Sequence, residues 1–311
     1  MVSTGSTSGR WDVVIVGAGP AGLSAALNLA RARRRVLVLD SNRPRNSATF
    51  HAHGFLSRDG ISPLELRRLG REELEAYPEA SYETSPVELV ETSPAGFTVR
   101  HRGGVAEASA IILATGLREL PPTLPSLRAF YGTSAHSCME CDGYEYADKP
   151  IALIGETDDL AERALLMSQW SRDLIVFTNG VGVVTPADEA RLAALGISVD
   201  RRAVADVAGD RSGITGVVLA DGSTVPRVGV FIRPQFEAVL DFAAPLALDR
   251  DREGLVLVDA DGRASIPGVY AMGDVTPPGP QQLIVAAGTG ARVAAALNRD
   301  LLGFHEASPV R

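Results

Sequence analysis

The sequence lacks features that define several common protein classes. Basic residues are outnumbered, with 30 lysines and arginines against 38 acidic residues, and Lys149 is the single lysine. The net charge of −8 disfavours a groove for nucleic acid, whose phosphates select positive surfaces. The chain has no run of the roughly 18–20 apolar residues that a membrane helix requires. Residues 1–10 lack the apolar core of a signal peptide, so we expect a cytoplasmic protein with neither nucleic-acid nor membrane partners.

Cysteine is scarce as well. Cys138 and Cys141 are the only two, and they lie three positions apart. In a reducing compartment such a pair more often serves as a redox or metal-binding motif than as a structural disulfide. The remaining composition is that of an ordinary folded protein, with 45% hydrophobic and 22% charged residues. A length of 311 residues is natural for two domains.

The first forty residues follow a β-α-β pattern. An apolar run at residues 11–16 and a second run that ends in Asp40 are typical of central parallel strands. Between them, Gly17 permits a tight turn, Gly19 lets a pyrophosphate approach the backbone, and Gly22 lets helix and strand pack closely. The helix N-terminus favours phosphate, and a carboxylate after the second strand can hold a ribose hydroxyl. The pattern predicts a bound dinucleotide; the alternative is a tight turn without a ligand.

A second β-α-β unit begins near residue 150. We expect a strand at residues 150–154, a helix at 160–170 and another strand at 174–177. Segments with proline at residues 121–125 and 233–234 are typical of linkers. The two β-α-β starts predict an α/β fold with two related nucleotide-binding domains, the second inserted into the first.

The segment at residues 138–143 carries chemistry of its own. A spacing of three lets Cys138 and Cys141 close a disulfide across one helical turn, and a helix N-terminus there would favour a nucleophilic thiolate. Asp142, next to the second cysteine, is placed to move a proton. Two alternatives stay open: a zinc site completed by His51 and His53, and a merely structural cysteine pair.

The order of these motifs resembles the low-molecular-weight thioredoxin reductases. The resemblance covers residues 11–302 approximately and implies two Rossmann-like domains of the FAD/NAD-linked reductase type. It implies an FAD-binding domain of residues 1–121 and 235–311, an inserted NAD(P)-domain-like domain of residues 122–234 that carries the cysteine pair, and a homodimer. The motifs that carry the resemblance lie at residues 17–22, 114–116, 138–143 and 273–274.

The same resemblance implies which residues hold the FAD. Asp274 should bond the ribityl chain, and Gln282 and Leu283 should lie at the pyrimidine edge of the flavin. The backbone of Val87 should meet the adenine, and the N-terminus of the last predicted helix would stabilise negative charge on the reduced flavin. The full implied set is Gly17, Gly19, Pro20, Ala21, Gly22, Asp40, Ser41, Asn46, His53, Val87, Ala114, Thr115, Gly116, Gly273, Asp274, Gln282 and Leu283.

One segment departs from the reductases that use NADPH. Those proteins carry a second glycine-rich turn and a basic cluster after the following strand. Here Gly155 is followed by Glu156, Asp158 and Asp159, whose carboxylates repel a pyrophosphate. Residues 177–180 offer no arginine or lysine. The sequence therefore predicts that the pyridine-nucleotide site is lost; the alternative is a diverged site that binds weakly.

Without a pyridine nucleotide, another partner must exchange electrons with the flavin. Residues 51–60 and 178–180 resemble the thioredoxin reductase-like dithiol oxidases of holomycin- and gliotoxin-type biosynthesis. Asp142 instead follows the reductases, since the oxidases often have histidine there. The sequence predicts an FAD-dependent dithiol oxidase that closes a disulfide in a small natural-product dithiol, with O2 as electron acceptor. The alternatives are a thioredoxin reductase driven by NADPH or ferredoxin, and a non-catalytic flavoprotein or redox sensor.

In the predicted mechanism a substrate thiolate attacks the disulfide at Cys138, which we expect to be the more exposed sulfur, and the second substrate thiol releases the product. Cys141 then passes electrons to the flavin. Asp142, His53 or His136 moves the protons, since a histidine changes its charge near the working pH. We expect the cysteine pair to stay beside the flavin because no nicotinamide has to be received there.

Overall fold

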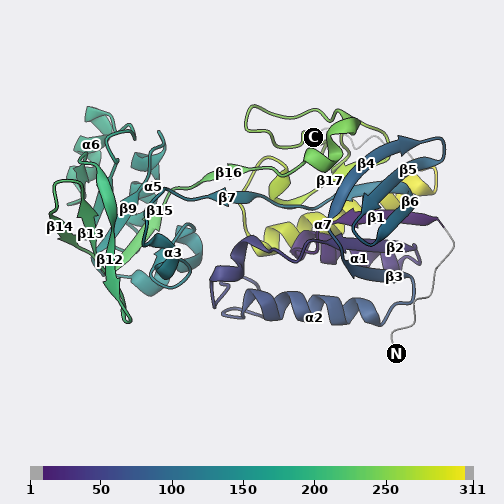
Figure 1. Ribbon diagram of the computed structural model, residues 1–311, viewed down its shortest axis with the longest axis horizontal. Helices are drawn as coiled ribbons and strands as arrows, with labels where there is room; N and C mark the ends of the chain where they lie inside the picture. Colours follow the sequence, from purple (N-terminus) through teal and green to yellow (C-terminus); the bar gives the residue numbers. More distant parts are fainter. Residues whose placement is uncertain (1–9, 305–311) are drawn as a thin grey trace.

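The computed structural model describes residues 10–304, which form two lobes joined by a pair of extended strands (Figure 1). Each lobe is built on a sheet whose central strands run parallel, with helices packed against it. This arrangement confirms the α/β class that the alternation of apolar strands and helices predicted.

The larger lobe contains a seven-stranded sheet of order β3-β2-β1-β6-β5-β4, with β17 beside β6. β4 and β5 run antiparallel to their neighbours, and the other strands are parallel. The central strands are apolar on both faces: in β1, Val13 and Ile15 pack toward one layer, and Val14 and Val16 toward the other. The strands are β1 (Trp11–Val16), β2 (Val36–Asp40), β3 (Ala80–Thr84), β4 (Val87–Ser93), β5 (Gly96–His101), β6 (Gly104–Leu113) and β17 (Val269–Ala271).

Three helices cover this sheet: α1 (Pro20–Arg31), α2 (Pro63–Glu75) and α7 (Leu283–Leu301). α1 and α7 pack very closely, because a Cβ atom on Gly290 of α7 would lie only 2.2 Å from the carbonyl oxygen of Ala21 in α1. α7 begins at Leu283, directly after Gln282, whose backbone is extended. The short helical turns of this lobe are η1 (Arg45–Ala48), η3 (Asp241–Leu246) and η4 (Gly273–Val275).

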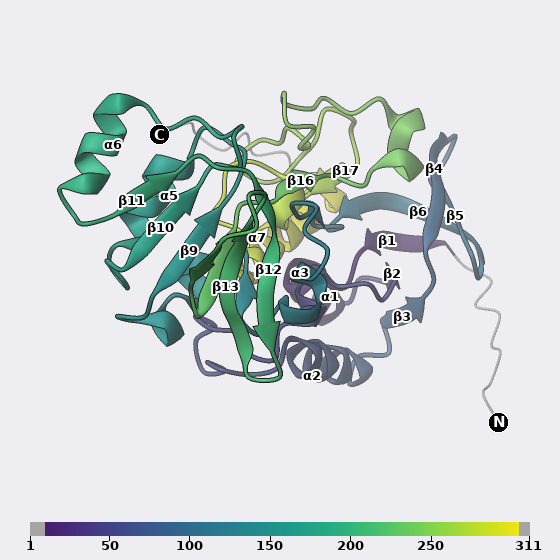
Figure 2. The same ribbon diagram turned by 60° about the vertical axis from the view of Figure 1, so that its left-hand side comes forward.

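The smaller lobe contains a five-stranded parallel sheet of order β11-β10-β9-β15-β8. Helices α5 and α6 cover one face, and the three-stranded sheet β12-β13-β14 packs on the other (Figure 2). The strands are β8 (Ala135–His136), β9 (Ile151–Ile154), β10 (Leu174–Phe177), β11 (Ser198–Asp200), β12 (Val204–Asp210), β13 (Gly213–Leu219), β14 (Thr224–Pro226) and β15 (Gly229–Ile232). The helices are α3 (Leu127–Phe130), α4 (Met139–Asp142), η2 (Tyr144–Tyr146), α5 (Leu160–Met167) and α6 (Pro186–Ala193).

Two short strands, β7 (Arg118–Leu120) and β16 (Gln235–Glu237), form the antiparallel ribbon that joins the lobes (Figure 1). Arg118 and Glu237 form an ion pair across the ribbon at 2.6 Å. The chain leaves the larger lobe along β7 and returns along β16, so the ribbon lies beside the predicted domain boundaries at 121/122 and 234/235.

Among residues 10–304, no helix is both long and apolar enough to span a bilayer. The longest helix of this range is α7, with 19 residues, and it carries charged side chains such as Arg292 and Arg299.

The close packing of α1 on α7 generates a stability prediction. We expect Gly290→Ala to lower the free energy of unfolding by about 1–3 kcal/mol, because the new methyl group collides with the α1 backbone. Gly288→Ala, two residues earlier in α7, is the matched control, since the described chain has no heavy atom within 4 Å of its Cβ position. Ala is the better helix former, so this control should gain about 0.5–1 kcal/mol. Denaturant unfolding measures both, and equal stabilities would contradict the packing argument.

Candidate active site

The first glycine turn lies between β1 and α1, against the end of β6. Gly17 has a φ of +107°, and a Cβ atom there would lie 2.4 Å from the carbonyl oxygen of Ala114. A Cβ atom on Gly22 would lie 1.9 Å from the carbonyl oxygen of Gly17. No heavy atom of the described chain lies within 4 Å of the Cβ position of Gly19, so its backbone is open to a ligand. This geometry suits a pyrophosphate. Pro20 and Ala21 open α1 beside the turn.

Asp40 ends β2 and is buried beside this turn. Its Oδ1 accepts a hydrogen bond from the backbone N of Ala18 at 3.0 Å, and its Oδ2 accepts one from Nη2 of Arg67 at 2.6 Å. The buried Arg67 of α2 also donates to the carbonyl oxygen of Ala18 at 3.3 Å. Because a carboxylate oxygen has two lone pairs, Oδ1 can still accept a bond from a ribose hydroxyl. The sequence analysis missed Arg67, since nothing in the spacing of α2 connects it with Asp40.

The segment after β6 contains an unsatisfied polar atom. The hydroxyl oxygen of Thr115 is buried and has no hydrogen-bond partner in the described chain. Gly116 has a φ of +64°, and its Cβ direction is open to at least 4 Å among the described residues. Buried hydroxyls normally have a partner, so this atom indicates a place where a ligand completes the bonding. Together with the open backbone of Gly19, this hydroxyl fits a ligand such as the dinucleotide part of FAD.

The other residues predicted to bind FAD come from five segments. Ser41 follows β2, Asn46 lies in η1, Val87 is the first residue of β4, and Gly273 and Asp274 open η4. Gln282 and Leu283 stand at the start of α7.

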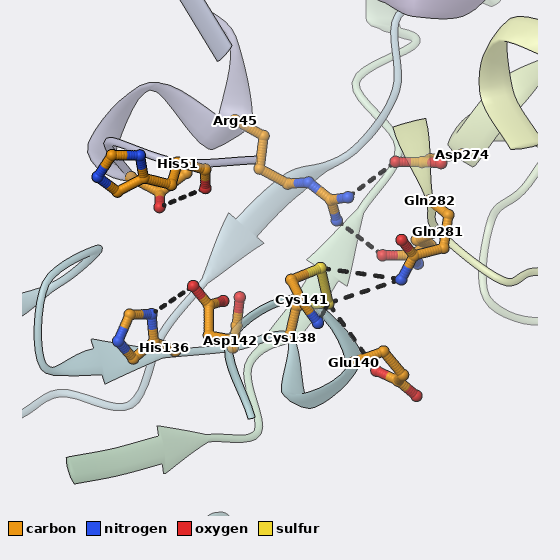
Figure 3. The surroundings of a disulfide bond; sticks show 12 residues. Arg45, His51, His136, Cys138, Glu140, Cys141, Asp142, Asp274, Gln281 and Gln282 are labelled. Atoms are coloured by element: carbon orange, nitrogen blue, oxygen red, sulfur yellow. Dashed lines mark hydrogen bonds and ion pairs between the residues drawn. A yellow bond between two sulfur atoms is a disulfide. The ribbon is translucent and has the colours of Figure 1, made fainter. Parts of the chain in front are cut away.

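Arg45, which the sequence analysis did not single out, joins η1 to the segment around η4. Its Nη2 lies 2.8 Å from Oδ2 of Asp274, and its Nη1 donates to Oε1 of Gln281 at 2.7 Å (Figure 3). Burial raises the pKa of Asp274, and the charge of Arg45 opposes that rise. The guanidinium thus neutralises a carboxylate that is largely removed from water.

Cys138 and Cys141 form a disulfide at the start of α4. The amide nitrogen of Gln282 lies 3.8 Å from each of the two sulfur atoms (Figure 3). The backbone N of Cys141 donates to the sulfur of Cys138 at 3.2 Å. Because Gln282 belongs to the other lobe, the contact places the sulfur pair against the segment predicted to hold the flavin. Both cysteines are half-buried.

Two of the residues predicted to move protons lie together beside the disulfide. Nδ1 of the buried His136 is 3.1 Å from Oδ1 of Asp142, and Figure 3 shows Asp142 between His136 and the cysteines. The two come from the end of β8 and the end of α4. The sequence places Asp142 next to Cys141, whereas only the fold brings His136 to it.

The structure places His53 differently. Its Nδ1 faces Asp59 at 3.4 Å, and its Nε2 faces Glu145 of the smaller lobe at 3.5 Å. His51 contacts the carbonyl oxygen of Gly60 through Nδ1 at 3.1 Å. Within residues 10–304 no group of three or more histidine, cysteine or acidic side chains is arranged to hold a metal ion. The zinc alternative therefore has no ligand cluster in the described chain.

The second glycine turn, between β9 and α5, is filled by protein groups. Nε of Arg233 lies 2.7 Å from Oδ2 of Asp159, and a Cβ atom on Gly155 would lie 2.8 Å from Cβ of Arg233. Glu156 accepts a bond from Nδ2 of Asn179 at 2.6 Å. The arginines after β11 are also engaged: Arg201 pairs with Glu189, and Arg202 with Asp200 and Asp221. The acidic turn and these ion pairs leave little for a nucleotide phosphate to bind.

Comparison with known proteins agrees with this architecture. The family model for pyridine nucleotide-disulphide oxidoreductases matches residues 11–290. The chain belongs to this family. A thioredoxin reductase of Streptomyces coelicolor is 31% identical over 91% of this chain and 91% of its own. The crystal structure of a putative thioredoxin reductase, TrxB, from Bacillus anthracis has a TM-score of 0.89 and 34% identity, covering 94% of this chain and 99% of its own. The crystal structure of HlmI has a TM-score of 0.90 and 37% identity, covering 96% of this chain and 94% of its own.

Membership of the pyridine nucleotide-disulphide oxidoreductases confirms the resemblance inferred from the motifs. It makes the chain a flavin-dependent oxidoreductase of the thioredoxin reductase-like type. Within this family, the described chain combines a disulfide against the segment predicted to hold the flavin with an Arg–Asp ion pair beside the second glycine turn.

The pairing of Asp40 with Arg67 generates a prediction about flavin retention. We expect Arg67→Met to lower the free energy of unfolding by about 3–5 kcal/mol, because it leaves a buried carboxylate without its partner. The purified variant should also lose flavin, since Asp40 supports the glycine turn. Arg68→Met is the control: Arg68 is exposed on the same helix and, within residues 10–304, pairs with Glu65 and Glu72, so stability should change little. Thermal unfolding and the flavin-to-protein absorbance ratio measure these effects. Full flavin content in the Arg67 variant would contradict the supporting role.

Proposed function

We propose that this protein is an FAD-dependent dithiol oxidase that forms a disulfide in a small-molecule dithiol and uses O2 as electron acceptor. The observation that carries the proposal is the contact of Gln282 with both sulfurs of the Cys138–Cys141 disulfide. It puts an oxidised sulfur pair against the segment to which we assign the flavin. A sulfur pair in this place can take two electrons from a dithiol and deliver them to an adjacent acceptor.

We assign the FAD to the turn after β1 and the neighbouring ends of β2 and β6. The backbone of Gly19 and the helix N-terminus would hold the pyrophosphate, Asp40 a ribose, and Asp274 the ribityl chain. The unpartnered hydroxyl of Thr115 would bond to the same ligand. Gln282, which contacts both sulfurs, would lie at the pyrimidine edge of the flavin. When bound, FAD supplies the two-electron acceptor that O2 can reoxidise, with hydrogen peroxide as product.

The chain's own residues carry out the sulfur chemistry. The substrate thiolate attacks Cys138, the bond between Cys138 and Cys141 breaks, and a mixed disulfide forms on Cys138. The second substrate thiolate then attacks the substrate sulfur of this mixed disulfide. Cys138 leaves as a thiolate, and the product leaves as a cyclic disulfide. The cysteine pair is now reduced by two electrons and must give them up before another turnover.

The second glycine turn argues against NADPH as the electron donor or acceptor. Glu156 and Asp158 belong to this turn, and the ion pair of Asp159 with Arg233 lies beside Gly155. The carboxylates would repel the phosphates of a dinucleotide, and Arg233, which could attract them, is paired with Asp159. HlmI shares the whole architecture at 37% identity, so the comparisons do not single out a thioredoxin reductase.

A thioredoxin reductase, driven by NADPH or ferredoxin, is the second candidate function. Several relatives favour this function because they are thioredoxin reductases by name, among them those of Streptomyces coelicolor and Bacillus anthracis. In that case the same sulfur pair would carry electrons outward from the flavin to a protein disulfide. The family resemblance also extends both proposals to a cytoplasmic homodimer.

Anaerobic stopped-flow spectroscopy of the flavoprotein distinguishes the two functions. For the oxidase we expect dithiothreitol, a small dithiol, to bleach the flavin rapidly, NADPH to leave it oxidised, and added air to restore the colour with peroxide formed. Cys138→Ser should abolish oxygen uptake with dithiothreitol, because the attacked sulfur is missing. Rapid bleaching by NADPH would overturn the oxidase in favour of the reductase.

A further inference from the structure

Glu140 places a carboxylate at the sulfur that the proposed substrate attacks. Its Oε2 lies 3.8 Å from the sulfur of Cys138, and its side chain is exposed. Figure 3 shows Glu140 on the other side of the cysteines from Asp142. Residues two positions apart on a helix do not face each other, so the two carboxylates have separate surroundings. Glu140 is the one that a dissolved molecule can reach together with Cys138.

The helix itself gains little from this carboxylate. An acid in the first turn of a helix commonly stabilises the free N–H groups of that turn. However, α4 contains only the four residues Met139–Asp142, and the sulfur of Cys138 already caps it by accepting from the backbone N of Cys141. Among the described residues, the group that Glu140 contacts at hydrogen-bond distance is that same sulfur. The position of Glu140 therefore bears on the sulfur chemistry more than on the stability of α4.

Two basic side chains of the larger lobe lie near the sulfur pair, and each faces carboxylates of its own. Nη2 of Arg45 lies 2.8 Å from Oδ2 of Asp274. The ring nitrogens of His53 face Asp59 at 3.4 Å and Glu145 at 3.5 Å. These carboxylates match the charge of both bases, so neither base is left to neutralise a further acid.

Arg163 is the basic side chain of the smaller lobe that interacts with Glu140. It donates to the carbonyl oxygen of Ser137, directly before Cys138, at 3.3 Å. Burial lowers the pKa of Arg163, and the charges of three carboxylates, Glu140 among them, oppose that fall. Arg163 is thus shared among three acids. Because residues 137–146 contain three acids and no lysine or arginine, the surroundings of Cys138 keep a negative charge.

We propose that Glu140 is a specificity-determining residue, through which the protein oxidises dithiols that carry an amine or another cationic group in preference to anionic dithiols. The inference deepens the proposed function and rests on it for the reaction. The attacking sulfur must come within bonding distance of Cys138, so a charge a few bonds away on the substrate lies within a Debye length, about 8–10 Å, of Glu140. An ammonium group there is attracted and a carboxylate is repelled.

The reaction itself makes this charge important. The substrate thiolate brings one negative charge to the sulfur of Cys138 as the new bond forms. The bond between Cys138 and Cys141 breaks, and its electron pair leaves with Cys141. The reacting atoms therefore carry a negative charge beside the Glu140 carboxylate throughout the step. A cation on the substrate offsets this repulsion, whereas an uncharged dithiol cannot.

Two pairs of dithiols test the inference. Dithiobutylamine carries an ammonium group and is compared with uncharged dithiothreitol; reduced lipoate carries a carboxylate and is compared with uncharged reduced lipoamide. The flavoprotein is mixed with each dithiol at low concentration, without oxygen or NADPH, and the second-order rate constant of flavin bleaching is expressed per thiolate. Each charged-to-uncharged ratio is then compared between the native protein and Glu140→Gln, so that the intrinsic reactivities of the thiols cancel.

We expect the amine ratio to fall about fivefold in Glu140→Gln and the carboxylate ratio to rise about threefold, because the nearby charge is gone. Glu140→Lys should move both ratios further in the same directions. Ratios that stay native in Glu140→Gln would overturn the proposal. A change in rate that is equal for all four dithiols would also overturn it, since Glu140 would then act on the sulfur and not on the substrate.

Glu162→Gln is the matched control. Glu162 is an exposed acid of α5 that also interacts with Arg163, so the same charge is removed from the same lobe. Both ratios should stay native in this variant, because Glu162 belongs to α5 and not to the segment of the cysteines. Ratios that shift as far as in Glu140→Gln would contradict the role assigned to the carboxylate beside Cys138.

Ionic strength tests the native protein without any variant. Salt at about 1 M should bring the amine ratio close to that of Glu140→Gln, since exposed charges are then screened. An amine ratio that does not respond to salt would overturn the inference. If none of the four dithiols bleaches the native flavin, the oxidase proposal fails together with this inference. If all four bleach it with ratios that Glu140→Gln leaves unchanged, the inference fails alone.

Discussion

The contact of Gln282 with the Cys138–Cys141 disulfide makes one site out of two lobes. The amide nitrogen lies 3.8 Å from each sulfur, and it comes from the first residue before α7, whereas the cysteines belong to α4 of the smaller lobe. Thiol–disulfide exchange and electron transfer between neighbouring groups require reacting atoms at contact distance. Everything proposed for the protein depends on the ribbon of β7 and β16 holding the lobes in this arrangement.

The two β-α-β units of the described chain differ in the side chains that surround their glycine turns. In the first, Gly19 leaves the backbone open and a buried threonine hydroxyl lacks a partner. In the second, Arg233 and Asp159 neutralise each other over Gly155, and nearby acids add negative charge. A dinucleotide binds through its phosphates, so open amide groups attract it and nearby carboxylates repel it. Local side-chain chemistry, and not the shared topology, therefore distinguishes the two sites.

Three carboxylates of the described chain that are largely shielded from water each lie beside a basic residue. Asp40 is matched by Arg67, Asp274 by Arg45, and Asp142 by His136. An isolated charge in a protein interior is so costly that each of these carboxylates requires a nearby cation or proton. Asp40 and Asp274 belong to the set predicted to bind FAD, and Asp142 is the neighbour of Cys141 in the sequence. The partner residues thus support the chemistry without being part of the recognisable motifs.

The sequence by itself determined the α/β class, the tight turn at Gly17, the acid at the end of β2 and the cysteine pair, because each depends on neighbouring residues and on strand or helix periodicity. It also determined that the second turn is acidic. Only the tertiary structure decided that Arg67 meets Asp40, that His136 meets Asp142, that His53 instead faces Asp59 and Glu145, and that Gln282 touches both sulfurs. These contacts join segments between 6 and 144 positions apart. Local sequence patterns do not predict these contacts, because the packing of whole helices and strands brings the side chains together.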